Sequence, residues 1–410
     1  MILVDNKLGL FLNIKTYKKS LSKLFNYRTK DLKEINTIIE NGTYLTRKDE
    51  KIIRVDKQSD IEPGRGEELL FYIRKMKTEI FLLENPIPIN DFSFINYNIN
   101  ILNNKIWYVL NSNNPKMNNQ NEDYFLCKYD IIKMGNIKLM VNDIHIEENK
   151  EIKQNIEDKI INYDINSLNK DNNPIFNILP DPKKYILSTE EAKNENKNCK
   201  ICHKNECNID NPIIGFCDCK NLFHFKCLKN IIQKKVSIKQ NKKKTTYNYY
   251  IRELYCKDCK LNYPLKFKIK EKEKIFEIIS IDIPKESNYM VLESIENEIY
   301  YGHIKLVFII KLDEKEIIRI GRKRVNDIII SDPSISKEHA EIKFEKGKIL
   351  IKNKSETFGS LVLVKKPLKI NENKICIQIG RTVISTRQMR FGEFETLKLK
   401  NKINHLTKKD

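Results

Sequence analysis

No apolar run in this 410-residue chain approaches the length of about 20 residues that a membrane-spanning helix needs. The amino-terminal stretch MILVDNKLGLFLNIKTYKK carries an acid at Asp5 and has no basic residue ahead of its short apolar runs, so it makes a poor secretory signal. The sequence therefore predicts an intracellular protein, cytoplasmic or nuclear, that is not secreted and has no transmembrane segment.

Without a secretory signal, the ten cysteines are not expected to form a disulfide framework, because disulfides persist in oxidising compartments. Seven of the cysteines and one histidine instead form closely spaced pairs: Cys199-x2-Cys202, Cys217-x-Cys219, His224-x2-Cys227 and Cys256-x2-Cys259. Each pair can reach one ion from one tight turn, and four pairs complete two tetrahedral sets of ligands. The spacing therefore predicts two Zn²⁺ ions per chain.

Two complete sets of four ligands leave no open coordination position. The zinc ions are therefore expected to hold a fold together and not to activate water. No residue is assigned a catalytic role, and whatever the zinc supports should work by binding. Cys207 lies outside the four pairs and is interpreted as a free loop thiol.

The formal net charge of +20 makes nucleic acid a first candidate partner. Lysine is spread along most of the chain, however, which is typical of a solvated surface. The one local basic run is KKVSIKQNKKK at 234–244, between Cys227 and Cys256, where a flexible insertion is expected. Nucleic acid is therefore an unlikely partner.

Patterning divides the chain into four segments and predicts a multidomain, mainly β protein. Residues 1–148 mix short apolar runs with Asn and Pro clusters and indicate a β-rich domain. Residues 149–195 are polar and Asn-rich, as in a linker. The cysteine-rich segment 196–268 is predicted to be a small two-zinc α+β module, and 285–400 a β-sandwich.

Strand signals are densest in the last third of the chain, where short β-branched runs alternate with turn residues, as in a sandwich. The runs are KIFEIISIDI, NYMVLESI, IKLVFIIKL, EIIRIG, NDIIIS, HAEIKF, KILIK, LVLV, KICIQIG and TVIS. A similar alternation, DIIKMGNIKLMVNDIHI, closes the N-terminal segment at 130–146.

The ligand order of the zinc module is C4HC3, with Cys-x-Cys as one pair and histidine as the fifth ligand. This order resembles the RING-variant (RING-CH) finger of one class of ubiquitin ligases. The residues around Ile201, the expected helix start at Cys227-Leu228, and Tyr263-Pro264 after the last pair add to the resemblance. It implies an interleaved cross-brace with two ligand sets: Cys199, Cys202, His224 and Cys227, and Cys217, Cys219, Cys256 and Cys259.

Ubiquitin ligases of this kind have no nucleophile of their own and act by holding a charged conjugating enzyme near a substrate. The resemblance implies that this enzyme binds a shallow apolar groove at Ile201 and the helix after Cys227. Leu228, Ile231 and Ile232 are spaced i, i+3, i+4 and are expected to share one helix face. The alternative is that these residues only pack the small core.

Three positions bear on the choice between zinc-finger classes. Ile231 stands where RING-CH fingers usually have tryptophan, and only four residues separate Cys219 from His224. Such a short gap is closer to the PHD finger, the other C4HC3 class, which reads histone tails. PHD fingers usually carry tryptophan two residues before the seventh ligand, where this chain has Leu254. RING-CH is therefore the preferred interpretation, and a PHD-like chromatin reader is an alternative.

The C-terminal sandwich resembles a forkhead-associated (FHA) domain, which binds phosphothreonine peptides through its loops. The resemblance rests on short motifs in the family order: Gly321-Arg322, Asn326-Asp327, Ser336-Lys337-x-His339-Ala340, Lys354-Ser355-Glu-Thr357-Phe358-Gly359-Ser360 and Gln378-Ile-Gly380-Arg381-Thr382. The family match implies a phosphopeptide site at Arg322, Ser336 and Lys337. Gly321, Asn326, His339 and Gly359 are expected to be framework residues of its loops.

The chemistry of these side chains suits a phosphate, which offers three strong acceptor oxygens. Arg322 can donate two parallel hydrogen bonds to it, Ser336 can donate a hydroxyl, and Lys337 adds a point charge. Where the family generally has an asparagine that grips the peptide backbone, this chain has Phe358. Weak selectivity for the residues around the phosphothreonine is therefore expected.

The N-terminal segment carries a fainter signal. Asp130-Ile-Ile-Lys-Met-Gly135 followed by Asn136 resembles the closing strands of another FHA-like sandwich, and Gly64-Arg65 lacks the later motifs. The segment is interpreted as a degenerate FHA-like scaffold.

The preferred hypothesis is a RING-type ubiquitin ligase that recruits phosphothreonine-containing substrates and a ubiquitin-conjugating enzyme. The alternatives are a non-enzymatic phosphoprotein adaptor whose finger is structural, and a chromatin or nucleic-acid reader.

Overall fold

The structure is a computed structural model of the chain. It describes residues 10–18, 26–39, 42–55, 67–76, 79–83, 105–110, 123–146, 186–187, 197–217, 219, 221–269, 274–284, 287–295, 298–299, 302–313, 316–365, 368–389, 393 and 396. Most of the predicted linker, 149–195, and Gly64-Arg65 lie outside the described residues.

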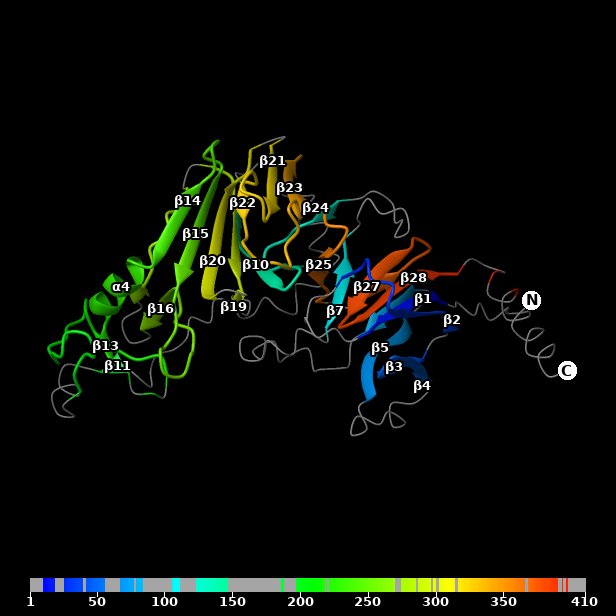
Figure 1. The fold of residues 1–410 in the computed structure, drawn as a ribbon, viewed down its shortest axis with the longest axis horizontal. Helices are drawn as coiled ribbons and strands as arrows, with labels where there is room; N and C mark the ends of the chain where they lie inside the picture. Colours follow the sequence, from blue (N-terminus) through cyan, green and yellow to red (C-terminus); the bar gives the residue numbers. More distant parts are fainter. Residues whose placement is uncertain are drawn as a thin grey trace.

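The fold is mainly β, as predicted, and a 13-stranded sheet runs along the long axis of the molecule (Figure 1). In spatial order its strands are β14 (Val236–Gln240), β15 (Thr246–Arg252), β20 (Gly302–Lys311), β18 (Tyr289–Ser294), β10 (Ile137–His145), β9 (Ile131–Met134), β25 (Ser360–Leu363), β7 (Ile106–Val109), β27 (Ile375–Ile379), β28 (Thr382–Gln388), β1 (Leu10–Tyr17) and β2 (Leu32–Ile39), with β19 (Glu298–Ile299) beside β20.

Two five-stranded sheets accompany the large one. The first has the order β22 (Ile328–Ile329), β21 (Ile317–Gly321), β23 (Ala340–Glu345), β24 (Lys348–Asn353) and β8 (Tyr124–Phe125). The second has the order β26 (Leu368–Ile370), β6 (Glu79–Leu83), β5 (Glu67–Met76), β3 (Tyr44–Lys48) and β4 (Lys51–Val55).

Each small sheet shares a hydrophobic core with a different part of the large sheet. One core joins Leu139 and Phe308 of the large sheet to Ile342 of β23. The other joins Leu12 and Ile377 to Phe71 of β5. The apolar side chains alternate with more exposed ones along β23 and β1, which is the pattern of a strand with one buried face. The chain thus forms two sandwiches on one continuous sheet.

Strands from the two ends of the sequence alternate in these sheets. β7 lies between β25 and β27, and β9 pairs with the other edge of β25. β8 pairs with β24, and β1 pairs with β28. Each of the ten predicted strand runs beyond residue 270 contains a strand, and the run at 130–146 forms β9 and β10. The predicted boundaries at 148, 196, 268 and 285 remain a prediction. The 13-stranded sheet contains strands from all three of the predicted domains.

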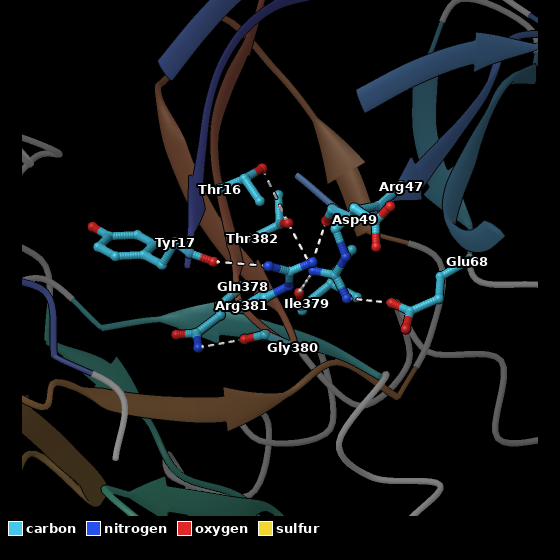
Figure 2. A network of polar contacts seen from close by, with 10 residues as sticks. All are labelled: Thr16, Tyr17, Arg47, Asp49, Glu68, Gln378, Ile379, Gly380, Arg381 and Thr382. Atoms are coloured by element: carbon cyan, nitrogen blue, oxygen red, sulfur yellow. Dashed lines mark hydrogen bonds and ion pairs between the residues drawn. The ribbon is translucent and has the colours of Figure 1, made fainter. Parts of the chain in front are cut away.

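A buried arginine joins the second small sheet to the large one (Figure 2). Arg47 of β3 is 5% exposed, and its Nη1 donates to Thr382 Oγ1 at 2.8 Å while its Nη2 pairs with Glu68. Arg381, in the β27–β28 turn, donates to the backbone carbonyl of Asp49. Because a buried charge left unpaired is costly, these contacts fix the position of the turn against β3.

The cysteine-rich segment packs on the outer face of the large sheet. It contributes β12 (Ile213–Ile214), β13 (Phe223–His224), the helix α4 (Phe225–Gln233) and β16 (Lys266–Ile269). Two strands from outside 196–268 complete its sheets: β11 (Ile186–Leu187) pairs with β12, and β17 (Lys274–Glu277) pairs with β16. Leu228 and Ile232 of α4 share a core with Tyr249 and Ile251 of β15.

The expectation of a flexible insertion at 234–244 is wrong. Part of this run is strand β14, which pairs with β15, and β15 pairs with β20 over seven residues. Beyond the strands, Asn241 Nδ2 donates to Asp327 Oδ1 at 2.8 Å, and Asn248 Nδ2 donates to the Asp327 carbonyl at 2.9 Å. Of the lysines in this run, Lys239 lies on β14, Lys234 and Lys235 follow helix α4, and the three at 242–244 lie in the exposed turn of the β14–β15 hairpin.

Strand β20 is buried on both faces, which explains its uninterrupted apolar run. Leu306 and Phe308 point into the sandwich core, whereas Val307 and Ile309 point into the core of the zinc module. All four side chains are at most 1% exposed. Consecutive side chains of a strand face opposite sides, so one strand serves two cores.

We predict that truncating β20 on its zinc-module side also destabilises the sandwich. Ile309→Ala should lower the free energy of unfolding by about 2–5 kcal/mol, because it leaves a cavity in a packed core. The measurement is thermal unfolding followed by the fluorescence of Trp107, the single tryptophan, which is 1% exposed. Ile238→Ala on β14, where the side chain is 56% exposed, is the control and should change little. An unchanged Trp107 transition in Ile309→Ala would contradict a shared cooperative unit.

No helix among the described residues is long and apolar enough to cross a membrane.

Two candidate metal centres and a candidate phosphate site

The eight predicted ligands come together as two clusters. Cys199, Cys202, His224 and Cys227 form site 1, and Cys217, Cys219, Cys256 and Cys259 form site 2. Within each cluster the candidate ligand atoms all lie within 4.8 Å of one another. The first and third pairs in the sequence share one site, and the second and fourth share the other, which is the interleaved arrangement that the RING-CH resemblance implied.

Matching turns present the two Cys-x2-Cys pairs. In site 1 the N–H of Cys199 donates to the Lys204 carbonyl at 2.9 Å, and the N–H of His203 donates back to the Cys199 carbonyl at 2.8 Å. In site 2 Cys256 donates to Leu261 at 2.8 Å, and Lys260 donates to Cys256 at 3.0 Å. The residue after each second cysteine has a positive φ, 59° at His203 and 63° at Lys260. The same backbone device therefore aims both thiol pairs.

Site 1 has the geometry of a three-sulfur, one-nitrogen zinc site. His224 Nδ1 lies 3.2 Å from Cys202 Sγ and 3.9 Å from Cys227 Sγ. These distances bracket the spacing of about 3.5 Å that tetrahedral Zn–S and Zn–N bonds impose. The other ring nitrogen, Nε2, lies 2.8 Å from the Glu206 carbonyl. Donation from Nε2 to that carbonyl leaves the Nδ1 lone pair facing the thiols.

Backbone amides favour a thiolate at Cys199. Burial raises the pKa of this thiol, but N–H groups of Cys202, His224 and Ile201 donate to its sulfur, and the net effect is a lowered pKa. Burial raises the pKa of Cys227, in the same cluster, to about 12, with the neighbouring thiols adding to the effect. A cation among these sulfurs would favour their ionisation.

Site 2 shows the same opposition between its thiols. Asn221 Nδ2 donates to Cys256 Sγ at 3.1 Å and to Asp258 Oδ2 at 2.8 Å. Burial raises the pKa of Cys256, but the backbone amides of Cys259 and Asp258 and the Asn221 side chain lower it to about 6. Burial raises the pKa of Cys217 to about 12. A divalent cation among the four sulfurs would remove this conflict.

Both clusters could bind zinc. One offers four sulfurs and the other three sulfurs and an imidazole nitrogen, which are the donors that structural zinc prefers. Bound zinc would crosslink the turns and leave no position for a reacting water. Cys207 belongs to neither cluster and packs against Ile213 and Leu222.

The residues expected to contact a conjugating enzyme differ in exposure. Helix α4 begins at Phe225, two residues before the predicted start at Cys227. Leu228 is 3% exposed and lies in the core, whereas Ile231 is 38% exposed. Ile201 is half-buried in the Cys199–Cys202 turn. Ile201 and Ile231 therefore reach the surface, and Leu228 supports the helix from beneath.

The predicted phosphate-binding residues lie on two loops that hydrogen-bond to each other. Arg322 follows β21, and its N–H donates to the Ser336 carbonyl at 3.0 Å. Its Nε donates to the Ile335 carbonyl at 3.2 Å, which fixes the guanidinium plane. Neither Nη group has a partner among the described residues, and Lys337 Nζ likewise has none. Both side chains are exposed beside the half-buried Ser336.

His339 joins two loops from a buried position. Its Nδ1 accepts from the Ser336 N–H at 3.0 Å, and its Nε2 lies 2.9 Å from the Gly359 carbonyl, to which it donates. Burial lowers the pKa of His339 to about 4. The ring is therefore neutral at physiological pH and braces the loops without adding charge.

Gly321 and Asn326 shape the same loops. A Cβ at Gly321 would lie 2.4 Å from the Lys337 carbonyl oxygen, so only glycine allows this approach of the two loops. Asn326 Nδ2 donates to the carbonyls of Lys323 and Lys337, both at 2.8 Å. The backbone around Arg322 and Lys337 is thus held by residues that do not themselves face solvent.

Two contributions to this site were not predicted from the sequence. Ser336 Oγ lies 2.7 Å from Ser355 Oγ, so Ser355 orients the hydroxyl of Ser336, which is predicted to bind the phosphate. The second is the packing of Tyr27, near the N-terminus, against Gly359, which has a φ of +67°. The Ser355 contact could have been suspected from the quoted motif, but nothing near Tyr27 signals its partner.

A comparison with protein families matches residues 318–383 to the FHA domain. The match runs from β21 into β28 and includes Arg322, Ser336, Lys337 and His339. Searches of curated proteins and of solved structures returned no match. The chain therefore contains an FHA domain in its C-terminal part, a class of domain that recognises phosphothreonine.

We predict that the purified full-length chain carries two zinc ions. Cys227→Ala in site 1 and Cys219→Ala in site 2 should each reduce the content to one ion, because each removes one ligand of four. Cys207→Ala is the matched control and should keep both ions. Elemental analysis of protein prepared without chelators tests this, and one ion or none in the wild type would refute the two-site assignment.

Proposed function

We propose that the FHA domain binds phosphothreonine-containing proteins through Arg322, Ser336 and Lys337. The observation that carries this proposal is the hydrogen bonding of Arg322. Its Nε donates to the Ile335 carbonyl, and neither Nη group has a partner among the described residues. The hydroxyl of Ser336 and the side chain of Lys337 belong to the loop that Arg322 contacts. A phosphate at this position receives a two-pronged charge-assisted grip from Arg322, a hydroxyl contact and a further charge.

We further propose that the zinc module is a RING-CH finger that recruits a ubiquitin-conjugating enzyme. The interleaved ligand clusters and the surface positions of Ile201 and Ile231 support this role. β20 contributes both to the core of the zinc module and to the sandwich core that includes the FHA strands β21 and β23. An enzyme bound at the finger would therefore be held at a fixed distance from a bound phosphoprotein. Catalysis would then arise from proximity, without a catalytic residue of this chain.

A second candidate function is that of a non-enzymatic phosphoprotein adaptor. Two features favour it: Ile231 is smaller than the tryptophan usual at that position, and Leu228 is in the core. In an adaptor the zinc ions would only stabilise the finger.

The phosphate site is tested by the binding of phosphothreonine peptides to the full-length chain. Arg322→Ala should lower affinity at least about tenfold, because charge-assisted hydrogen bonds contribute roughly 1.5–3 kcal/mol. Lys337→Ala should have a smaller effect, and Arg324→Ala, an exposed arginine of the same loop, serves as the control. Unphosphorylated peptides should not bind. Equal binding of phosphorylated and unphosphorylated forms would refute the proposal.

Ligase activity is tested by autoubiquitination against a broad panel of conjugating enzymes. Ile201→Ala should abolish chain formation with zinc content unchanged, because it removes apolar surface and no ligand. Ile238→Ala, an exposed isoleucine on β14, should retain activity. If the wild type is inactive with every enzyme of the panel, the adaptor function replaces the ligase.

A further inference from the structure

The described N-terminal residues 26–30 lie against the FHA loop formed by Ser355–Gly359, more than 300 positions away in the sequence. The Tyr27 N–H donates to the Thr357 carbonyl at 2.9 Å. The next residue, Arg28, forms an ion pair with Glu356. Two successive residues of one segment thus contact two successive residues of the loop.

Tyr27 anchors this segment. A Cβ on Gly359 would lie 2.6 Å from a Tyr27 ring carbon, so the ring occupies the space that any other residue at 359 would need. The Tyr27 hydroxyl donates to Gln378 Oε1, and its ring meets the edge of Tyr17 with a centroid distance of 6.4 Å. The position of Arg28 follows from this anchor.

The loop that Arg28 reaches adjoins the phosphate site. Ser355 contacts Ser336 with their hydroxyl oxygens 2.7 Å apart, and Glu356 is the residue after Ser355. The Glu356 carboxylate is 52% exposed and carries the same sign of charge as a phosphate. An unpaired carboxylate here would disfavour a phosphopeptide. Arg28 neutralises it.

We propose that Arg28 is a further phosphopeptide-binding residue, selective for peptides with an acidic side chain beside the phosphothreonine. This inference rests on the proposed phosphothreonine function. The Arg28–Glu356 pair is exposed on both sides, with 61% and 52% of the two side chains accessible. Glu356 pairs with Nη2 of Arg28, and a guanidinium also carries N–H donors on Nη1 and Nε. An acidic peptide residue binds these further donors while Glu356 stays neutralised, and the peptide gains a contact that the FHA match alone does not contain.

The experiment uses the full-length chain and a phosphothreonine peptide library in which Glu, Gln or Lys is fixed at each flanking position. The wild type should prefer Glu over Gln at one or more positions. Arg28→Gln should remove that preference, with a loss of about tenfold for the Glu peptide and little change for the Gln peptide. Glu356→Gln should strengthen binding of both peptides. Lys30→Gln, an exposed lysine of the same segment, is the control for loss of charge.

The outcomes separate the two levels of the proposal. If the wild type shows no phosphate-dependent binding, the proposed function itself fails. If the wild type binds but Arg28→Gln keeps the same Glu-to-Gln preference, Arg28 has only a structural role and this inference is refuted. If Arg28→Gln does not fold, two other variants test the inference. Arg28→Lys should retain part of the preference for the Glu peptide over the Gln peptide. Glu356→Gln should bind both peptides more tightly, and unchanged affinity in this variant refutes the inference.

Discussion

The double burial of β20 is the constraint on which the rest of the structure depends. Phe308 and its neighbours at alternate positions fill the sandwich core, and Val307 and Ile309 fill the core of the zinc module. A shift of one residue in the register of β20 would exchange the two sets of side chains between the cores. The pairing of β20 with β15 and β18 therefore sets the zinc module and the sandwich relative to each other.

This shared strand also bears on how binding at the two sites could be coupled. The β14–β15 hairpin belongs to the zinc-module segment, yet three of its side chains bond to Asp327, in the loop that begins at Arg322. The Arg322 loop therefore has partners both in the zinc-module segment and in the sandwich. Two modules joined in this way differ from two domains on a flexible tether, because the orientation of one bound partner determines where the other can lie.

Local signals could be predicted from the sequence, and long-range pairings could not. The ligand spacings and the Gly321 to His339 motifs lie within short stretches, and the structure brings each set together. The β-branched runs correctly indicated strands. Their alternation does not specify which strands pair, so nothing in the sequence indicated that β7 lies between β25 and β27. The basic run at 234–244 was misjudged because β14 is an edge strand with no buried face, so its short sequence VSIKQ shows no alternation of buried and exposed positions. Helical spacing predicted that Leu228, Ile231 and Ile232 share one face. Leu228 and Ile232 are buried, whereas Ile231 is 38% exposed, so the spacing predicted the face but not the exposure of each residue.

The proposed phosphate site depends on both ends of the chain. A segment cut at residue 285 would retain Arg322 and His339 but would lose β7, β9 and β1, which pair with β25 and β28. It would also lose Tyr27, whose ring packs on Gly359, and so the support of the loop whose carbonyl accepts from His339. Fixing the orientation of a binding side chain before its ligand arrives lowers the cost of binding. Arg322 is oriented by the carbonyls of Ile335 and Ser336, in loops between strands whose sheets are completed by N-terminal strands. The family motif would therefore supply the chemistry of the site, and the first 146 residues help to supply its rigidity.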